Sequence, residues 1–271
     1  EDFLDGWLVD PADATTTGLL LAAAIRQIGD VDLVLAGDAS VDNGAQLLIR
    51  STIANCKSPN GCSRVLNNAT ASATGEISPG GGINIAGGAD ATIRRTTFFA
   101  NSAGHGFGAA LAVTGAGSTV LLEGDIFYAQ LTRPIDVSSG ANLTAAFVTA
   151  WGNNVGSSAT FNVGGAGANV AVFSSVTLDD TTFSSPTGGA TLYADCIVTR
   201  SLANFPPPPD AASFELVASA AAVLAAPAIG SPRLRADSPA IDYCDTFRYT
   251  PVDTDIHGEV RGTDAPAVPN G

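Results

Sequence analysis

Several acidic residues near the middle of the chain have the side chains that polysaccharide cleavage requires. Glycoside hydrolases hold two carboxyl groups a few ångströms apart, one as the acid and the other as the base or nucleophile. Lyases hold Ca²⁺ with carboxylates and use an Arg or Lys as the base. The candidate carboxylates are Asp125, Asp136, Asp179, Asp180 and Asp195.

Two of these residues cannot act as one catalytic pair. Asp179 and Asp180 are adjacent, so on a strand their side chains point to opposite faces. Asp125 and Asp180 occupy roughly equivalent places on different coils and could line one face, so they are the expected catalytic residues if the chain is an enzyme. Because a pair at the required spacing is not evident, we favour a solubilising role for these acids, with Arg94, Arg95 and Arg133 as surface partners.

Other catalytic and cofactor motifs are missing from the sequence. It has no G-x-G-x-x-G, P-loop, H-E-x-x-H or G-x-S-x-G motif. Its two histidines, His105 and His257, offer little for a catalytic triad or a zinc site. Residues 13–46 resemble a stretch of electron-transfer flavoprotein subunits, but the α/β continuation that binds nucleotide does not follow. We therefore expect no cofactor and no metal.

The composition predicts a folded, extended-chain protein. Of the 271 residues, 45% are hydrophobic and 14% charged, with 30 Gly and no Met. Such a chain can bury a core and favours strands and tight turns over long helices. The net charge of −14 excludes binding to nucleic acid and anionic membranes, which requires clustered Lys and Arg. The longest apolar stretches, 18–25 and 216–229, are too short to cross a bilayer.

The cysteines predict a secreted or cell-surface location. Cys56 and Cys62 flank a short turn, whereas Cys196 and Cys244 each stand beside an Asp. We expect two disulfide bonds, most simply 56–62 and 196–244, although the sequence allows three pairings. Disulfide bonds imply an oxidising compartment. The absence of an initial Met leads us to expect a processed product.

Short apolar strands in the centre of the chain form a degenerate repeat. Residues 80–104 contain two alternating strands split by Gly-Gly, then a Thr-Thr-Phe corner and an Ala-Asn exit. Similar corners recur at 51–55, 125–130, 148–154 and 181–185. A repeat of 20–30 residues with short strands is typical of a solenoid, in which stacked coils bury a continuous core. An antiparallel β-sandwich would need hairpin signals every 8–12 residues.

Four apolar corner residues predict how the coils stack. Ile53, Phe98, Phe127 and Phe183 are separated by 45, 29 and 56 residues. These separations fit a coil of about 28 residues, with an insertion in the first coil and two coils in the last interval. We therefore expect these four side chains to form one column inside the solenoid.

The two ends of the chain differ from this repeat. Residues 15–28 predict a helix that caps the solenoid, with Thr15 to Thr17 as N-caps and Gly29 as its stop. Four prolines in 205–210 form a stiff spacer that can neither pair as a strand nor enter a helix. We expect three parts: an N-terminal extension and capping helix (1–30), a right-handed parallel β-helix (31–204), and a Pro-rich spacer, last irregular coil and loop-rich cap (205–271).

Two motifs resemble bacterial secreted and surface proteins with the pectin-lyase-like β-helix fold, including polymorphic outer-membrane-type repeat proteins. Residues 80–103 are similar to their coils. Asp237-Ser-Pro-Ala-Ile-Asp242 followed by Asp255-Ile-His-Gly-Glu-Val-Arg261 is similar to the motif that often closes such helices, although the customary acidic end is replaced by TDAPAVPNG. The resemblance covers about residues 45–262 and implies the fold more strongly than the function, because this fold hosts lyases, hydrolases, adhesins and filaments.

The sequence favours a non-enzymatic extracellular structural or surface protein, a filament or an adhesin. Phe3, Trp7 and Val9 alternate in the first ten residues and could dock on a neighbouring copy by strand addition, giving an end-to-end homo-oligomer. Two alternatives remain open. One is a polysaccharide lyase or glycoside hydrolase acting on the outer face of the β-helix, and the other is a glycan-binding module.

Overall fold

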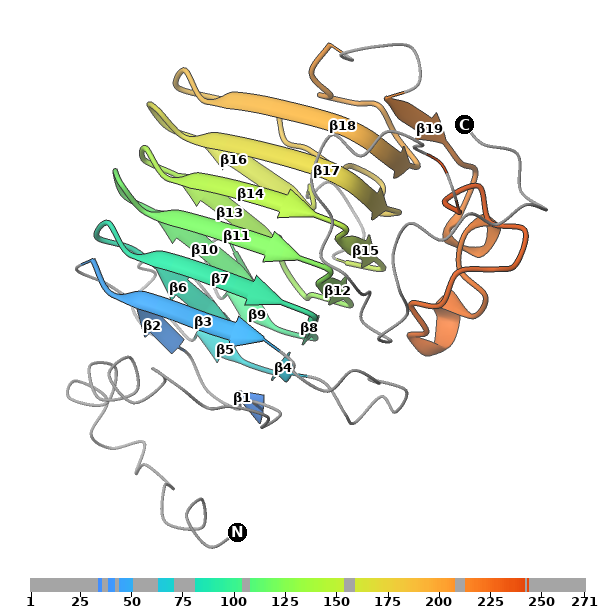
Figure 1. Ribbon diagram of the computed structural model, residues 1–271, viewed down its shortest axis with the longest axis horizontal. Helices are drawn as coiled ribbons and strands as arrows, with labels where there is room; N and C mark the ends of the chain where they lie inside the picture. The colour runs from blue at the N-terminus through green and yellow to red at the C-terminus, as the bar shows by residue number, and fades with distance from the viewer. Residues whose placement is uncertain are drawn as a thin grey trace, which may run out of the picture.

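A computed structural model shows an all-β protein whose parallel strands stack as a β-solenoid (Figure 1). The structure describes residues 34–35, 39–41, 44–50, 63–70, 81–103, 108–153, 159–207, 213–241 and 243. The predicted capping helix at 15–28 and the closing residues 244–271 lie outside these ranges. Within the described residues, no helix is long and apolar enough to cross a membrane.

Two parallel sheets run along the solenoid, and a small two-stranded sheet joins β5 (Ala69–Thr70) to β9 (Ser102–Ala103). The first large sheet, sheet B, has five strands, which pair in the order β16-β13-β10-β6-β2. Its strands are β2 (Ala39–Val41), β6 (Ile83–Ile85), β10 (Leu111–Thr114), β13 (Ile135–Ser138) and β16 (Phe161–Gly164).

The second large sheet, sheet A, has 12 strands in two parts. Each coil passes from sheet B into the first part and then into the second part. The first part contains β3 (Gln46–Arg50), β7 (Asp90–Arg94), β11 (Thr119–Glu123) and β14 (Asn142–Ala146). The second part contains β1 (Val34–Leu35), β4 (Ser63–Leu66), β8 (Thr96–Phe99), β12 (Ile126–Tyr128), β15 (Thr149–Trp151) and β19 (Phe214–Leu216). The nine-residue strands β17 (Asn169–Thr177) and β18 (Thr191–Thr199) run through both parts.

The bend between the two parts of sheet A has the same backbone conformation in every described coil. Its residue has a positive φ, between 45° and 70°. Only one member is Gly, although L side chains disfavour this conformation. The stacked hydrogen bonds of the coils above and below hold it in place. The bend residues are Arg95, Gly124, Phe147, Ser174 and Cys196.

Inward side chains alternate along the strands and form continuous columns. Phe98 pairs with Phe127 across β8 and β12, and their rings stack with centroids 4.6 Å apart. Both side chains are fully buried. This pair confirms the predicted register between these two coils.

The other two members of the predicted column do not extend it among the described residues. Phe183 bridges Phe161 beyond sheet B, so it belongs to a different column, and the expectation that it stacks with Phe127 is corrected. The reason is that its Thr-Thr-Phe sequence copies the earlier corner but precedes β18 instead of ending a coil. Ile53 lies outside the described residues, and Val65 is the residue that pairs with Phe98.

The length of a coil is not constant at the predicted value of about 28 residues. Hydrogen-bonded equivalents on adjacent coils are 29, 23, 27 and 22 residues apart in successive parts of the solenoid. The strands keep their parallel register throughout. The differences in length therefore lie in the bends.

The C-terminal segment covers the second part of sheet A from outside (Figure 1). Beyond the spacer, β19 pairs with β18, so the solenoid continues past residue 204. Two short 3-10 helices, η3 (Ala220–Ala222) and η4 (Pro227–Ile229), follow. A second apolar cluster joins this segment to the strands: Ile126, Trp151, Leu178, Val198, Val217, Val223 and Leu224. We call residues 217–243 the strap.

The spacer also closes the upper end of the core. Phe205, which precedes the prolines, packs edge-on against Phe183 at 4.8 Å. Phe214 packs edge-on against Phe205 at 4.7 Å. Together these rings cover the last coil.

Candidate functional site

The carboxylate of Asp125 holds the backbone of two neighbouring coils together. The residue is fully buried and follows the bend between β11 and β12. One carboxylate oxygen accepts the N–H of Thr96 at 2.8 Å, and the other accepts the N–H of Glu123 at 3.0 Å. These bonds link two neighbouring coils, so this side chain has a structural role.

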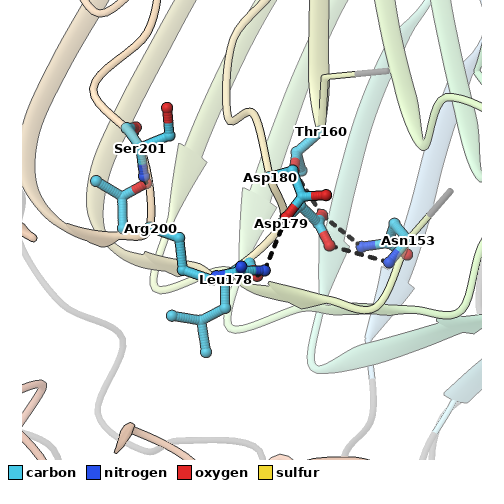
Figure 2. A network of polar contacts seen from close by, with 8 residues as sticks. Asn153, Thr160, Leu178, Asp179, Asp180, Arg200 and Ser201 are labelled. Carbon is cyan, nitrogen blue, oxygen red and sulfur yellow. Dashed lines mark hydrogen bonds and ion pairs between the residues drawn. The ribbon is translucent and has the colours of Figure 1, made fainter. Parts of the chain in front are cut away.

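Asp179 and Asp180 follow the end of β17 and have different partners, Asn153 for Asp179 and Arg200 for Asp180 (Figure 2). Asp179 is buried and accepts hydrogen bonds from the N–H of Asn153 at 2.9 Å and from Thr160 Oγ1 at 2.7 Å. Asp180 faces outward with 52% of its side chain exposed, and it pairs with Arg200 at 2.9 Å. Both residues lie in the bend after β17, so the alternation of side chains along a strand, on which the sequence argument depended, does not apply to them.

The structure does not bring Asp125 and Asp180 into one site. Asp125 lies at the bend between the two parts of sheet A. Ser175 takes the equivalent position two coils later, and its Oγ accepts the N–H of Val148 at 3.0 Å. Asp180 comes directly after the outer corner of its coil. The expectation that they occupy equivalent places on one face is therefore corrected.

Asp179 ends a ladder of buried amide side chains that the sequence argument missed. In each coil, the side-chain oxygen of one residue accepts the backbone N–H of its equivalent in the preceding coil, at 2.9–3.1 Å. The only sequence signal is the small or left-handed residue that precedes several members, such as Ala100, Ala129 and Gly152. The ladder residues are Asn68, Asn101, Gln130, Asn153 and Asp179.

A carboxylate suits the last position of this ladder. Asn153 donates to Asp179 through both its backbone N–H and Nδ2, and Thr160 adds a third donor. A carboxylate can accept hydrogen bonds at both of its oxygens. An amide would have an NH2 group in place of one oxygen, and this group could not accept a hydrogen bond from these donors. Burial raises the pKa of Asp179, the nearby charge of Asp180 raises it further, and the hydrogen bonds from Asn153 and Thr160 oppose the rise.

Asp136 belongs to a polar cluster on the outer side of sheet B. Asn162 Nδ2 donates to Asp136 Oδ1, and Arg133 Nη1 donates to Asn162 Oδ1 at 3.2 Å. Burial raises the pKa of Asp136, while the hydrogen bonds from Asn162 and Ser138 and the charge of Arg133 lower it. Asp136 is a single buried carboxyl group here, so the cluster does not provide the two carboxylates that glycoside hydrolysis needs.

The remaining candidates have varied positions. Arg94 forms an ion pair with Glu123. Asp195 is buried near Tyr243, where burial raises the pKa of the tyrosine to about 12 with help from the charges of Glu215 and Asp195. Cys196 is buried at the bend of β18, where its φ is positive. The other predicted site residues lie outside the described residues: Phe3, Trp7, Val9, Cys56, Cys62, Cys244, His105 and His257.

The outer side of the first part of sheet A faces the viewer in Figure 1. Two outward rows of side chains cross its six strands, and Asp90 is the sole carboxylate in them. Its first row is Gln46, Asp90, Thr119, Asn142, Asn169 and Thr191, and its second row is Leu48, Thr92, Leu121, Thr144, Ala171 and Tyr193.

Comparisons with known proteins give no family for this chain. No family model, curated protein or solved structure matches the chain. In the described part of the chain, no three His, Cys, Asp or Glu side chains gather in a way that could hold a metal ion.

Proposed function

We propose that this chain is a non-enzymatic, secreted structural or surface protein of the pectin-lyase-like β-helix type. The proposal rests on the contacts that the candidate carboxylates of the chain make. Asp125 and Asp179, the buried members of the candidate set with the best-defined contacts, accept hydrogen bonds that link neighbouring coils. Asp180, the exposed member, is paired with Arg200. This arrangement supports a rigid scaffold over a polysaccharide-cleaving enzyme.

The last strand supports assembly of copies end to end. In the described residues, β19 pairs with β18 only over Ile197–Thr199, so the first half of β18 forms hydrogen bonds on one side, with β17. A parallel strand edge of this kind can pair with a strand from another chain. The alternating segment Phe3 to Val9 supplies such a strand in the proposal.

Sedimentation velocity tests this assembly. The full chain is compared with a variant lacking residues 1–10, from micromolar to near-millimolar concentration, with electron microscopy of the concentrated sample. We expect the full chain to form larger species as concentration rises and the shortened chain to remain monomeric. A full chain that stays monomeric at every concentration would contradict end-to-end assembly.

The absence of catalysis is tested separately. Acidic and neutral polysaccharides are incubated with the chain, with and without Ca²⁺, and assayed for reducing ends and unsaturated products. We expect neither product. Turnover that is lost in Asp125→Asn or Asp180→Asn, with folding retained, would establish the lyase or hydrolase alternative.

A further inference from the structure

The last coil of the solenoid is shorter than the coils before it. Ile197 on β18 and Phe214 on β19 are paired in sheet A and lie 17 residues apart, whereas equivalents in the four earlier coils are 22 to 29 residues apart. Among the described residues between them, the chain forms no strand in the first part of sheet A. The solenoid therefore ends on an incomplete coil, of which β19 is the described strand.

One column of aligned positions runs through the whole second part of sheet A. It begins in β1 and finishes in β19, the strands at the two ends of this part (Figure 1). The six residues between its two ends face inward, and each has at most 1% of its surface exposed. In order along the column, its members are Leu35, Val65, Phe98, Phe127, Ala150, Thr177, Thr199 and Leu216.

The last member of this column is exposed. Leu216 is aligned with the buried Thr199, yet 58% of its surface is open to solvent. Among the described strands, β19 pairs with β18 alone, so no further coil covers Leu216. Leu202, which follows β18, is also exposed, at 47%. Stacked coils bury the inward side chains of a solenoid, so this end presents an apolar surface that one more coil would cover.

We infer that this coil belongs to a second copy of the chain, whose β1 pairs in parallel with β19; the inference rests on the end-to-end assembly proposed above and defines its polarity. Continuing the register of sheet A aligns Leu35 of the second copy with Leu216, and Val34 of the second copy with Glu215. Leucine supplies the apolar side chain that the position beyond Leu216 requires. The contact joins two different ends, so it repeats from copy to copy and gives a filament.

One copy can make this contact and donate its first residues at the same time. From β7 to β18, equivalent positions in a first-part strand and in the second-part strand one coil later are 28 to 35 residues apart. Gly6, in the middle of the segment Phe3 to Val9, precedes Leu35 by 29 residues. The segment can therefore pair with the first half of β18 while β1 of the same copy pairs with β19.

A head-to-head dimer fits this end less well. Every strand pairing of sheet A in the described residues is parallel, whereas two β19 strands related by a two-fold axis would be antiparallel. Centring that pair on Glu215 would set two carboxylates directly opposite each other, which is destabilising. The head-to-head arrangement is the competing outcome of the experiment.

Disulfide cross-linking of two single variants distinguishes these arrangements. Glu215→Cys and Val34→Cys are mixed at high concentration and oxidised, and proteolytic peptides are identified by mass spectrometry. Aligned residues on neighbouring strands lie about 4.8 Å apart, within the Cα separation of about 4.4–6.8 Å that a disulfide bond spans. We expect a peptide that links positions 34 and 215 in the mixture. Ala228→Cys, on η4 in the strap, replaces Glu215→Cys in the control and should give no link to position 34.

Two cross-linking results would overturn the inference. One is the absence of a link between positions 34 and 215 at every concentration. The other is a link between two copies of Glu215→Cys when this variant is oxidised alone, because that product requires two upper ends to meet.

A charge at the exposed end of the column provides a second test. Leu216→Lys should weaken association at least about tenfold in sedimentation velocity, because the contact would bury an unpaired charge. Ile229→Lys places the same charge in the strap, where the side chain is 84% exposed, and should associate as the parent chain does. Circular dichroism and melting temperatures establish that both variants fold. Association of Leu216→Lys equal to that of the parent would contradict the contact.

The variant that lacks residues 1–10 separates this inference from strand donation. If its association is lost while Leu216→Lys associates normally, donation of the first residues stands and the contact between β19 and β1 fails. If its association equals that of the parent while Leu216→Lys is weakened and positions 34 and 215 are linked, the contact stands and strand donation fails.

Discussion

Several buried polar side chains in the described part of this solenoid connect neighbouring coils. The amide ladder from Asn68 to Asp179 supplies an acceptor to one backbone N–H in each coil it joins. These N–H groups stand at the corners, where the strand ladder is interrupted. An unpaired buried N–H is costly, which explains why an amide or a carboxylate takes each position.

The ladder predicts a large effect for Asn153→Ala. This change removes the Nδ2 donor to Phe127 O and Asp179, and also the oxygen that accepts the N–H of Gln130. Because these partners would be left without hydrogen bonds, the free energy of unfolding should fall by about 3 kcal/mol. Urea denaturation measures it, with Asn169→Ala on the exposed face as the control, which should cost less than about 0.5 kcal/mol. Equal losses in both variants would contradict the ladder's role.

Asp136 predicts a pH dependence of stability. Because burial raises its pKa in the folded state, the fold holds the proton more tightly than the unfolded chain does. The resulting stabilisation is fully present below the unfolded pKa of about 3.9 and is lost as pH rises through the raised value. The advantage of the parent chain over Asp136→Asn should therefore be greatest at acid pH and shrink toward neutrality.

Urea denaturation at several pH values between acid and neutral measures this difference. Asp237 provides the comparison, because its hydrogen bond with Arg235 lowers its pKa and gives the opposite sign. The advantage of the parent chain over Asp237→Asn should shrink as pH falls. A difference for Asp136→Asn that does not vary with pH would rule out the linkage.

At the scale of strands and bends, the sequence predicted the type of element better than its register. Alternating apolar residues identified the parallel strands from residue 80 onward, and the Phe corner correctly aligned Phe98 with Phe127. Phe183 was placed in the wrong column because coils of 22 to 29 residues defeat a constant period. The ladder escaped notice because its members differ in residue type and spacing.

A double-mutant cycle distinguishes the two columns. Phe98→Ala and Phe127→Ala should each cost about 3–5 kcal/mol, and their stacked rings should couple by about 0.5–1.5 kcal/mol. Phe98→Ala and Phe183→Ala concern different columns and should be close to additive. Coupling between Phe98 and Phe183 as strong as that between Phe98 and Phe127 would contradict the observed register.

For the whole molecule, the strap ties the end of the chain to coils formed much earlier. Trp151 Nε1 donates to Pro227 O at 3.2 Å, and Tyr128 packs against Gly230. Tyr128 and Trp151 stack at 4.6 Å, so their faces are occupied by each other and are not open to a sugar. The aromatic row therefore stabilises the strap.

The strap also bears on the predicted disulfide between Cys196 and Cys244. Tyr243 precedes Cys244, and Asp195 precedes Cys196. The charge of Asp195 contributes to the raised pKa of Tyr243, so the two residues lie near each other. We expect mass spectrometry of unreduced proteolytic peptides to find the pairs 196–244 and 56–62. Reduction should then make the strap more sensitive to limited proteolysis than the coils. Linked peptides that join Cys196 to Cys56 or Cys62 would contradict this pairing.

Unequal coil lengths with constant strand register have a consequence for how such a protein can change over time. Strands β3 and β4 keep their partners although twelve residues separate them, while Arg94 and Thr96, at the ends of the equivalent strands one coil later, are separated by Arg95 alone. Segments can therefore be gained or lost at a bend while the neighbouring layers remain paired. A lineage that carries this scaffold can acquire new loops, and with them new specificities, without having to evolve a new core.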